Sequence, residues 1–271
     1  MGLLAAGLLG VVQGLTEFLP VSSSAHLVLA RAFFGWNVDE GSFGLAFDVS
    51  LHVGTLIALV LFFRREITGI LSALPEALSA ERGPGKLLRL IVIGTIPVVI
   101  AGALAAKWLE ENLRTPPVIA VTLILGAIWL ILAEKLGSQD RNEDSLTAAG
   151  AFVAGVAEST ALVPGMSRSG STISMAMLLG LTRESAARFS FLLGIPAILG
   201  AAAKEAPHII KLGVTAQDGA LFLVGMTVSA AVGYLTIRYF LRYLVGHSLN
   251  VFAYYRLALA AVTIVWLVRQ P

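Results

Sequence analysis

The chain has 271 residues, of which 57% are hydrophobic and only 13% are charged. Soluble domains carry about 25% charged residues, so this composition excludes a disordered chain and indicates an integral membrane protein. The net charge of +2 is small and the basic residues are scattered, which argues against a nucleic-acid partner. Because there is no cysteine, disulfides, zinc–thiolate sites and iron–sulfur clusters are excluded.

The first apolar stretch, residues 3–34, is interrupted by polar residues and a proline between positions 13 and 24. Neither half is long enough to cross a membrane, since a spanning helix needs about 20 apolar residues. We therefore expect a re-entrant helix–loop–helix hairpin, whose irregular backbone must be packed in protein or line a wet cavity. Spanning helices are predicted next at residues 45–63, 88–106 and 117–133.

A second interrupted stretch, residues 148–180, has the same layout and predicts a second re-entrant hairpin. Spanning helices are predicted after it at residues 184–203, 219–237 and 251–268. The loops between these segments are too short to form another folded unit. The sequence thus predicts an all-α integral membrane protein with one transmembrane domain, residues 1–271, made of six transmembrane helices and two hairpins.

The two interrupted stretches resemble each other. Residues 10–13 match residues 155–158 at an offset of 145, and residues 20–23 match residues 164–167 at an offset of 144. Chance similarity between two Gly/Ala/Ser-rich segments is the alternative, but the order, spacing and half-length offset favour a repeat.

Each half of the chain, about 1–136 and about 147–271, would hold one hairpin and three spanning helices. Because three is odd, the second half would enter from the opposite face. This predicts an inverted-topology repeat, whose binding sites typically lie near the membrane midplane.

The basic residues orient this arrangement, because an excess of them marks the cytoplasmic side. One face carries twelve: Arg64, Arg65, Arg82, Lys86, Arg89, Lys135, Arg141, Arg183, Arg188, Arg238, Arg242 and Arg256. The other face carries six: Arg31, Lys107, Arg114, Lys204, Lys211 and Arg269. The first hairpin and its site are therefore predicted to open to the outer, periplasmic side.

Gln13 and Glu17 lie one helical turn apart and share a helix face. A charge inside the bilayer costs about 2.5–3.5 kcal/mol on insertion scales and is usually functional, so Glu17 is a candidate catalytic residue. Their oxygens are of the type that Mg²⁺ or Ca²⁺ prefers. We therefore expect a divalent cation, held by Glu17 and Gln13 together with substrate phosphates.

The residues after Pro20 form the candidate chemical centre of the first stretch. Ser22, Ser23 and Ser24 lie where the next helix would begin, so their hydroxyls and backbone N–H groups can converge on an anion. His26 follows one turn later, at a reach suited to proton transfer. Two routes are open: Ser23 attacks phosphorus with His26 as base, or His26 activates water. Packing explains Ser22 and Ser24 equally well.

In the second stretch, the run from Ser167 through Arg168 to Gly170 indicates an anion-binding nest with a guanidinium group. Arginine binds phosphate oxygens bidentately and stays charged. Glycines at 165 and 170 would let the backbone approach the ligand. The predicted substrate-binding residues are Ser22, Ser24, Gly165, Ser167, Ser169, Gly170 and Thr172, and Glu158 and His52 are predicted to support the site.

These residues resemble the undecaprenyl-diphosphatase family, also called the bacitracin-resistance family, over essentially the whole chain. The matching motifs are Gln13-x3-Glu17-Phe-Leu-Pro-x-Ser-Ser23-x2-His26, Pro164-Gly165-x-Ser167-Arg168-Ser169-Gly170, Phe47-Asp48 with His52-x-Gly54-Thr55, and Tyr255-Arg256. By position, the resemblance assigns function to Glu17, Ser23, His26, Ser167 and Arg168. Gln13 stands at the family's first carboxylate position, where a neutral amide cannot act as a base.

The resemblance implies hydrolysis of undecaprenyl diphosphate to undecaprenyl phosphate and phosphate in the bacterial inner membrane. This would recycle the lipid carrier for peptidoglycan synthesis and confer bacitracin resistance. Two alternatives stay open: a polyprenyl-phosphate transporter or flippase, because broken helices and inverted repeats are transporter features, and a phosphatase for another lipid diphosphate. A homodimer and a monomer are both compatible with the sequence.

Overall fold

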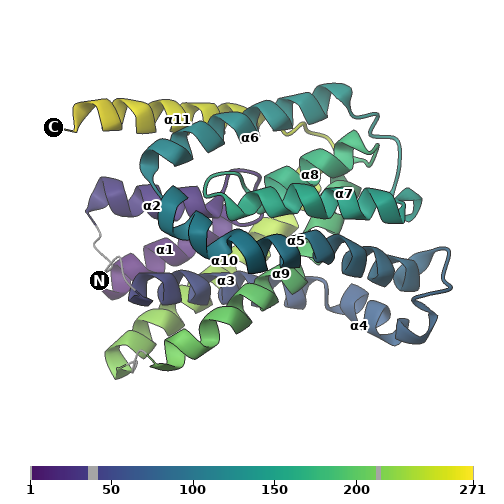
Figure 1. The fold of residues 1–271 in the computed structure, drawn as a ribbon, viewed down its shortest axis with the longest axis horizontal. Coiled ribbons are helices and arrows are strands. Elements are labelled where there is room, and N and C mark those ends of the chain that lie inside the picture. Colours follow the sequence, from purple (N-terminus) through teal and green to yellow (C-terminus); the bar gives the residue numbers. More distant parts are fainter. Residues whose placement is uncertain (1, 36–41, 212–214, 271) are drawn as a thin grey trace.

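The computed structural model describes residues 2–35, 42–211 and 215–270, and this part of the chain is a bundle of α-helices joined by short turns (Figure 1). The helices are α1 (Leu3–Thr16), α2 (Ser23–Phe34), α3 (Ser42–Phe62), α4 (Arg64–Ser72), α5 (Gly83–Leu113), α6 (Pro116–Leu136), α7 (Ala148–Ser159), α8 (Arg168–Leu178), α9 (Arg183–Lys211), α10 (Ala216–Leu244) and α11 (Asn250–Arg269). Short 3₁₀ turns cover Leu74–Glu76, Glu143–Ser145 and Thr160–Leu162.

Among the described residues, five helices are long and apolar enough to cross a membrane: α5, α6, α9, α10 and α11. A sixth span results if α3 and α4 are counted together, although the chain bends by 75° between them. The bend falls where an apolar run gives way to the charged residues 64–66. The prediction of an all-helical, multi-pass membrane protein is therefore confirmed. Five of the six predicted segments lie within one helix each, and the segment 45–63 passes the end of α3 by one residue.

Two pairs of shorter helices, α1 with α2 and α7 with α8, match the two interrupted stretches of the sequence. Their connecting turns end in the same backbone conformation. Ser22 has φ 75° and ψ 98°, and Ser167 has φ 73° and ψ 113°. A positive φ is uncommon for a residue other than glycine. Each serine hydroxyl accepts a bond from the backbone N–H three residues later, that of Ala25 or Gly170, and so caps the next helix.

The short helices pack on long helices of the opposite half of the chain. α1 packs against α10, and α7 packs against α5. Both contacts depend on glycine, since a Cβ atom on Gly10 would lie 2.7 Å from the Gly225 carbonyl oxygen and one on Gly155 would lie 1.9 Å from that of Gly94. Small residues let helix backbones approach closely in this way. α6 and α11 run side by side along one edge of the molecule (Figure 1).

A cluster of aromatic side chains lies directly behind the first turn. Phe18, which follows Glu17, is fully buried and meets Phe191 of α9 edge to face at a centroid distance of 5.4 Å. Phe191 in turn contacts Phe63 and Phe240, at 6.3 Å and 6.2 Å. Because such cores are close-packed, this cluster fixes the backbone from which Glu17 projects.

Candidate active site

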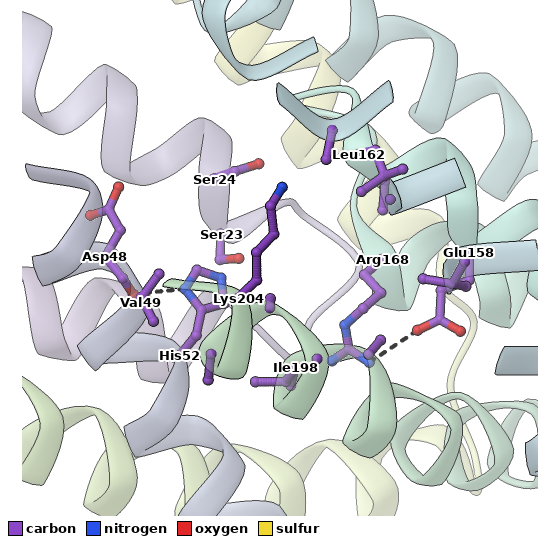
Figure 2. Close-up of a pocket in the computed structure, with 18 of the residues that line it drawn as sticks. Ser23, Ser24, Asp48, Val49, His52, Glu158, Leu162, Arg168, Ile198 and Lys204 are labelled. Atoms are coloured by element: carbon purple, nitrogen blue, oxygen red, sulfur yellow. Dashed lines mark hydrogen bonds and ion pairs between the residues drawn. The ribbon is translucent and has the colours of Figure 1, made fainter. Parts of the chain in front are cut away.

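The two turns and the helices α3, α5 and α9 enclose a cavity of about 540 Å³ (Figure 2). Its polar wall includes Glu17, the serines at 22–24, His52, Glu158, Ser167 and Arg168. Its apolar wall comes from α5 and α9, mostly from small residues such as Gly102, Ala103, Ala106, Gly200 and Ala201. A cavity with one polar and one long apolar wall suits an amphiphilic ligand.

Glu17 lies at the centre of the polar wall, immediately after the last turn of α1. Its carboxylate is buried, and its Oε2 atom accepts bonds from the Ser23 hydroxyl at 2.7 Å and from the Gln13 amide at 2.9 Å. The imidazole Nε2 of His52 lies 3.5 Å from the same oxygen. Ser23 and Glu17 therefore have the geometry of a nucleophile and a base, which must lie within hydrogen-bonding reach of each other. Gln13 contributes an N–H that an ionised carboxylate at that position would lack.

Arg168, the first residue of α8, joins the two halves of the site. Its Nη2 donates to Glu17 Oε1 at 3.1 Å, and its Nη1 lies 3.6 Å from Glu158 Oε1 of α7 (Figure 2). The guanidinium lies over Gly194 of α9, where a Cβ atom would be only 1.3 Å from Nη1. The predicted partners Glu17 and Arg168 are thus brought together, with Glu158 behind them.

His26 does not contact Ser23, although it follows the serines by one helical turn and was expected to act on Ser23. Its Nδ1 bonds with the Ser22 carbonyl oxygen at 2.7 Å, and its Nε2 bonds with the Tyr255 hydroxyl at 2.7 Å. It does not belong to the cavity wall. Because both ring nitrogens are engaged away from Ser23, the expected role of His26 as the base for Ser23 is not supported by the geometry. His52, predicted only as a supporting residue, is the histidine that lines the cavity.

The predicted phosphate-binding set also divides into two groups. Ser22, Ser24 and Ser167 line the cavity, whereas Gly165, Ser169, Gly170 and Thr172 lie behind its wall. The second group makes structural contacts. The Ser169 hydroxyl donates to the Leu19 carbonyl of the first turn at 3.1 Å, and that of Thr172 donates to the Arg168 carbonyl within α8 at 2.9 Å. The Gly165 N–H donates to the Ser24 hydroxyl at 3.4 Å.

Gly165 is therefore required for a reason other than approach to a ligand. Its φ is +96°, and a Cβ atom there would lie 1.9 Å from the Thr122 hydroxyl of α6. A left-handed backbone conformation and a close contact with α6 both favour glycine. The contact holds the second turn against the helix bundle.

Comparison with known proteins agrees with this geometry. The model of the family described as "Bacitracin resistance protein BacA" matches residues 6–262. This chain belongs to the BacA family. Among its relatives named undecaprenyl-diphosphatase, that of Rubrobacter xylanophilus is 44% identical over 263 residues, which cover 96% of each chain. Those of Geotalea daltonii and Geobacter sulfurreducens are 41% and 42% identical, over 98% of this chain and 99% of theirs.

Arg256 of this BacA-family chain is a site residue whose role the sequence did not predict. It was counted among the basic residues of the cytoplasmic face, but its side chain is fully buried beneath the two turns. Its five N–H groups meet five backbone carbonyl oxygens at 2.9–3.2 Å, those of Pro20, Thr122, Leu123, Gly165 and Met166. Arginine has five donors, so each is satisfied, and one guanidinium holds both turns to α6.

Asp48 is a second residue whose role the sequence did not predict. Its buried carboxylate, on α3, accepts bonds from the guanidinium groups of Arg31 on α2 and Arg114 after α5. Asp48 and Arg114 line the cavity on the opposite side from Arg168 (Figure 2 labels Asp48 and Arg168). The only signal in the sequence was that Asp48 falls in a motif shared with the BacA family.

Proposed function

We propose that this protein hydrolyses undecaprenyl diphosphate to undecaprenyl phosphate and inorganic phosphate. Three relatives named undecaprenyl-diphosphatase match this chain over 96–99% of their own length. The observation that carries the proposal is the 2.7 Å bond from the Ser23 hydroxyl to Glu17, in a cavity whose opposite wall is apolar. The apolar wall suits a prenyl chain, and the polar wall suits a diphosphate. The activity would recycle the lipid carrier of peptidoglycan synthesis and underlie bacitracin resistance.

In the mechanism that this geometry favours, Ser23 Oγ attacks the terminal phosphorus while Glu17 accepts the hydroxyl proton. The bond from phosphorus to the bridging oxygen breaks, and undecaprenyl phosphate leaves. Water then attacks the phosphoserine, which releases phosphate and restores the Ser23 hydroxyl. Water attacking directly remains the alternative route, and it would leave no phosphoserine.

Two features stabilise negative charge on the phosphoryl oxygens. Arg168 supplies a fixed positive charge within a largely buried site. The helices α2 and α8 both begin at this wall, at Ser23 and Arg168, and the first N–H groups of a helix have no partner within it. Helix N-termini bind phosphate for this reason.

A divalent cation is part of the proposal. Neither oxygen of the buried Glu158 accepts a hydrogen bond from the described residues, and the same holds for Gln13 Oε1. Such oxygens fit Mg²⁺ or Ca²⁺. Within the described ranges no group of three or more acidic or histidine side chains could hold an ion, so substrate phosphates would complete the shell. Glu158, Glu17 and Gln13 would hold the cation, which would offset phosphate charge.

We further propose that residues 1–271 form one transmembrane domain, built as an inverted repeat with halves of about 1–136 and 147–271. The equal conformations at Ser22 and Ser167 support this, as does the crossed packing of α1 on α10 and α7 on α5. The short helix pairs would then be re-entrant hairpins beside six spans.

The basic residues still favour one orientation in the bacterial inner membrane. Without the buried Arg256, the balance is eleven against six, which keeps the cavity open to the periplasmic side. Because the chain lacks cysteine, single cysteines placed on either face and labelled from outside intact cells would test this orientation directly.

The enzymatic proposal is tested by phosphate release from undecaprenyl diphosphate by the purified protein in detergent. Wild-type protein should release phosphate, whereas Ser23→Ala protein of unchanged thermal stability should not. Absence of release by the wild type would overturn the proposal. If the Ser23→Ala protein still moved the lipid between leaflets of a vesicle at the wild-type rate, a transporter would be the better description.

A further inference from the structure

The carbonyl oxygen of Ser22 accepts two hydrogen bonds from His26. The backbone N–H of His26 donates at 3.3 Å and the imidazole Nδ1 lies at 2.7 Å. Because a carbonyl oxygen can only accept, Nδ1 carries the hydrogen, and in the neutral ring Nε2 is then an acceptor. The Tyr255 hydroxyl, 2.7 Å from Nε2, donates to it. His26 therefore has no free lone pair with which to take a proton from Ser23.

The second turn lacks such a side-chain donor. Its equivalent carbonyl, that of Ser167, accepts the backbone N–H of Ser171 at 2.9 Å, and within the described part of the chain no side chain donates to it. Ser171 stands where an offset of 145 places the counterpart of His26. Its hydroxyl accepts instead from the Thr160 hydroxyl at 3.0 Å. The additional donor is thus present only at the turn that precedes the nucleophile.

The bond from His26 fixes the direction of the next backbone N–H. The peptide unit between Ser22 and Ser23 is planar and trans, so its carbonyl and its N–H point in opposite directions. Ser23 is the first residue of α2, and its N–H has no partner within the helix and none elsewhere among the described residues. The positive φ of Ser22 is a conformation that persists only when surrounding contacts hold it. Both serines line the cavity, where an N–H of this kind can bind a phosphoryl oxygen.

We propose that His26 and Tyr255 are a pair of positioning residues, which hold the Ser22 carbonyl so that the Ser23 N–H points at the phosphoryl group under attack. Neither side chain would touch the substrate. α11 would then support this turn twice, because Arg256, next to Tyr255, also donates to the carbonyl of Pro20 at 3.2 Å. The inference rests on the proposed function and adds a backbone donor, aimed in advance at the phosphoryl oxygens, to its site.

Two amide variants of His26 separate this role from that of a base. His26→Asn places an N–H where Nδ1 was, whereas His26→Gln places one where Nε2 was, and neither amide can accept a proton as a base does. His26→Gln and His26→Ala should lower kcat by about 100- to 1000-fold, the usual effect of losing one such donor. His26→Asn should stay within about two- to twelvefold of wild type, since only the bond to Tyr255 is lost. Its pH–rate profile should keep the wild-type shape, because Nδ1 of His26 donates in both protonation states.

Tyr255→Phe tests the other end of the pair. It removes the hydroxyl but keeps the ring, which stacks on that of His26 at a centroid distance of 5.6 Å. It should lower kcat by the same two- to twelvefold, about the net contribution of one hydrogen bond. Tyr254→Phe is the matched control, because Tyr254 is 63% exposed and no hydrogen bond is recorded for it among the described residues. Thermal unfolding is measured on each preparation, since a merely structural role would lower stability and leave the kcat of the folded protein unchanged.

The positioning role is overturned if folded His26→Asn protein is as inactive as His26→Gln protein, the result expected of a base. It is also overturned if Tyr255→Phe turns over as fast as Tyr254→Phe. Phosphate release from undecaprenyl diphosphate by the wild type is measured in parallel, so the two proposals fail separately. If the wild type is active and either of these results is found, only the positioning role is wrong. If the wild type releases no phosphate, the proposed function is wrong and the positioning role falls with it.

Discussion

Substitution of Gly194 by alanine should strongly reduce turnover without changing a charged residue. A Cβ atom at this position would lie 1.3 Å from Arg168 Nη1, whereas ordinary contacts begin at 3.4 Å. The guanidinium must then move by about 2 Å, given normal van der Waals separations. Neither the 3.1 Å bond to Glu17 nor the 3.6 Å ion pair with Glu158 can absorb such a shift.

The cost follows from what the displaced guanidinium loses. A hydrogen bond to a charged group contributes about 1.5–3 kcal/mol, which corresponds to a decrease in kcat/KM of about 10- to 150-fold. The assay is phosphate release from undecaprenyl diphosphate at several substrate concentrations, with thermal unfolding measured on the same preparation. Gly219→Ala, in the first turn of α10, is the control, because a Cβ atom there meets nothing within 4 Å.

The reasoning makes the Arg168 position the cause of the loss, so it can be refuted in two ways. Turnover by Gly194→Ala protein indistinguishable from wild type would show that Arg168 need not lie where the structure places it. Equal losses in Gly194→Ala and Gly219→Ala would show a general effect of alanine on the helices.

Three further predictions concern the base, the clamp beneath the turns and the cation. Glu17→Gln should abolish phosphate release, and His26→Gln should reduce it less, because Ser23 bonds to Glu17 and not to His26. A larger loss of activity in His26→Gln than in Glu17→Gln would show that His26 is the base. Arg256→Lys leaves at least two of five carbonyls without a donor, each costing about 1–3 kcal/mol, so its melting temperature and kcat should both fall. Gly126→Ala should have the same effect, since its Cβ would lie 1.8 Å from Arg256 Nη2; normal stability in both would refute the clamp. Removal of divalent cations by a chelator should stop turnover until Mg²⁺ or Ca²⁺ is restored, and full activity after chelation would exclude the cation.

The helical architecture could be predicted from the sequence because lengths of apolar runs report directly on membrane spans. The predicted segments at 117–133 and 251–268 fall inside α6 and α11, each within a few residues of the observed ends. The bend between α3 and α4 was not predicted, because both sides of it are helical and only the packing sets its angle. Helix propensity carries no information on such a bend.

The sequence predicted several residues that line the cavity, but it predicted the contacts between their side chains less well. Glu17, Ser23 and Arg168, which line one cavity, could be singled out in the sequence because charged and hydroxyl groups are rare in an apolar chain. Sequence spacing could not show which way a side chain points, so His26 was placed beside Ser23 although it bonds to Tyr255. Arg256 was taken for a surface charge, because a single arginine near a helix start looks the same whether it faces water or five carbonyl groups.

The two turns have similar backbone conformations but present different side chains to the cavity. Ser23 and Arg168 occupy equivalent places, each the first residue of the helix that follows a serine with positive φ. The structure therefore pairs Ser22 with Ser167 at an offset of 145, whereas the sequence match at an offset of 144 had paired Ser23 with Ser167. Both contact the same carboxylate, since Ser23 donates to Glu17 Oε2 and Arg168 to Glu17 Oε1. The fold brings two helix N-termini to one carboxylate, and we propose that the residue types at those positions decide the chemistry. In the proposed mechanism, the first half would supply the nucleophile and its base, and the second would supply the positive charge that the transferred phosphoryl group needs.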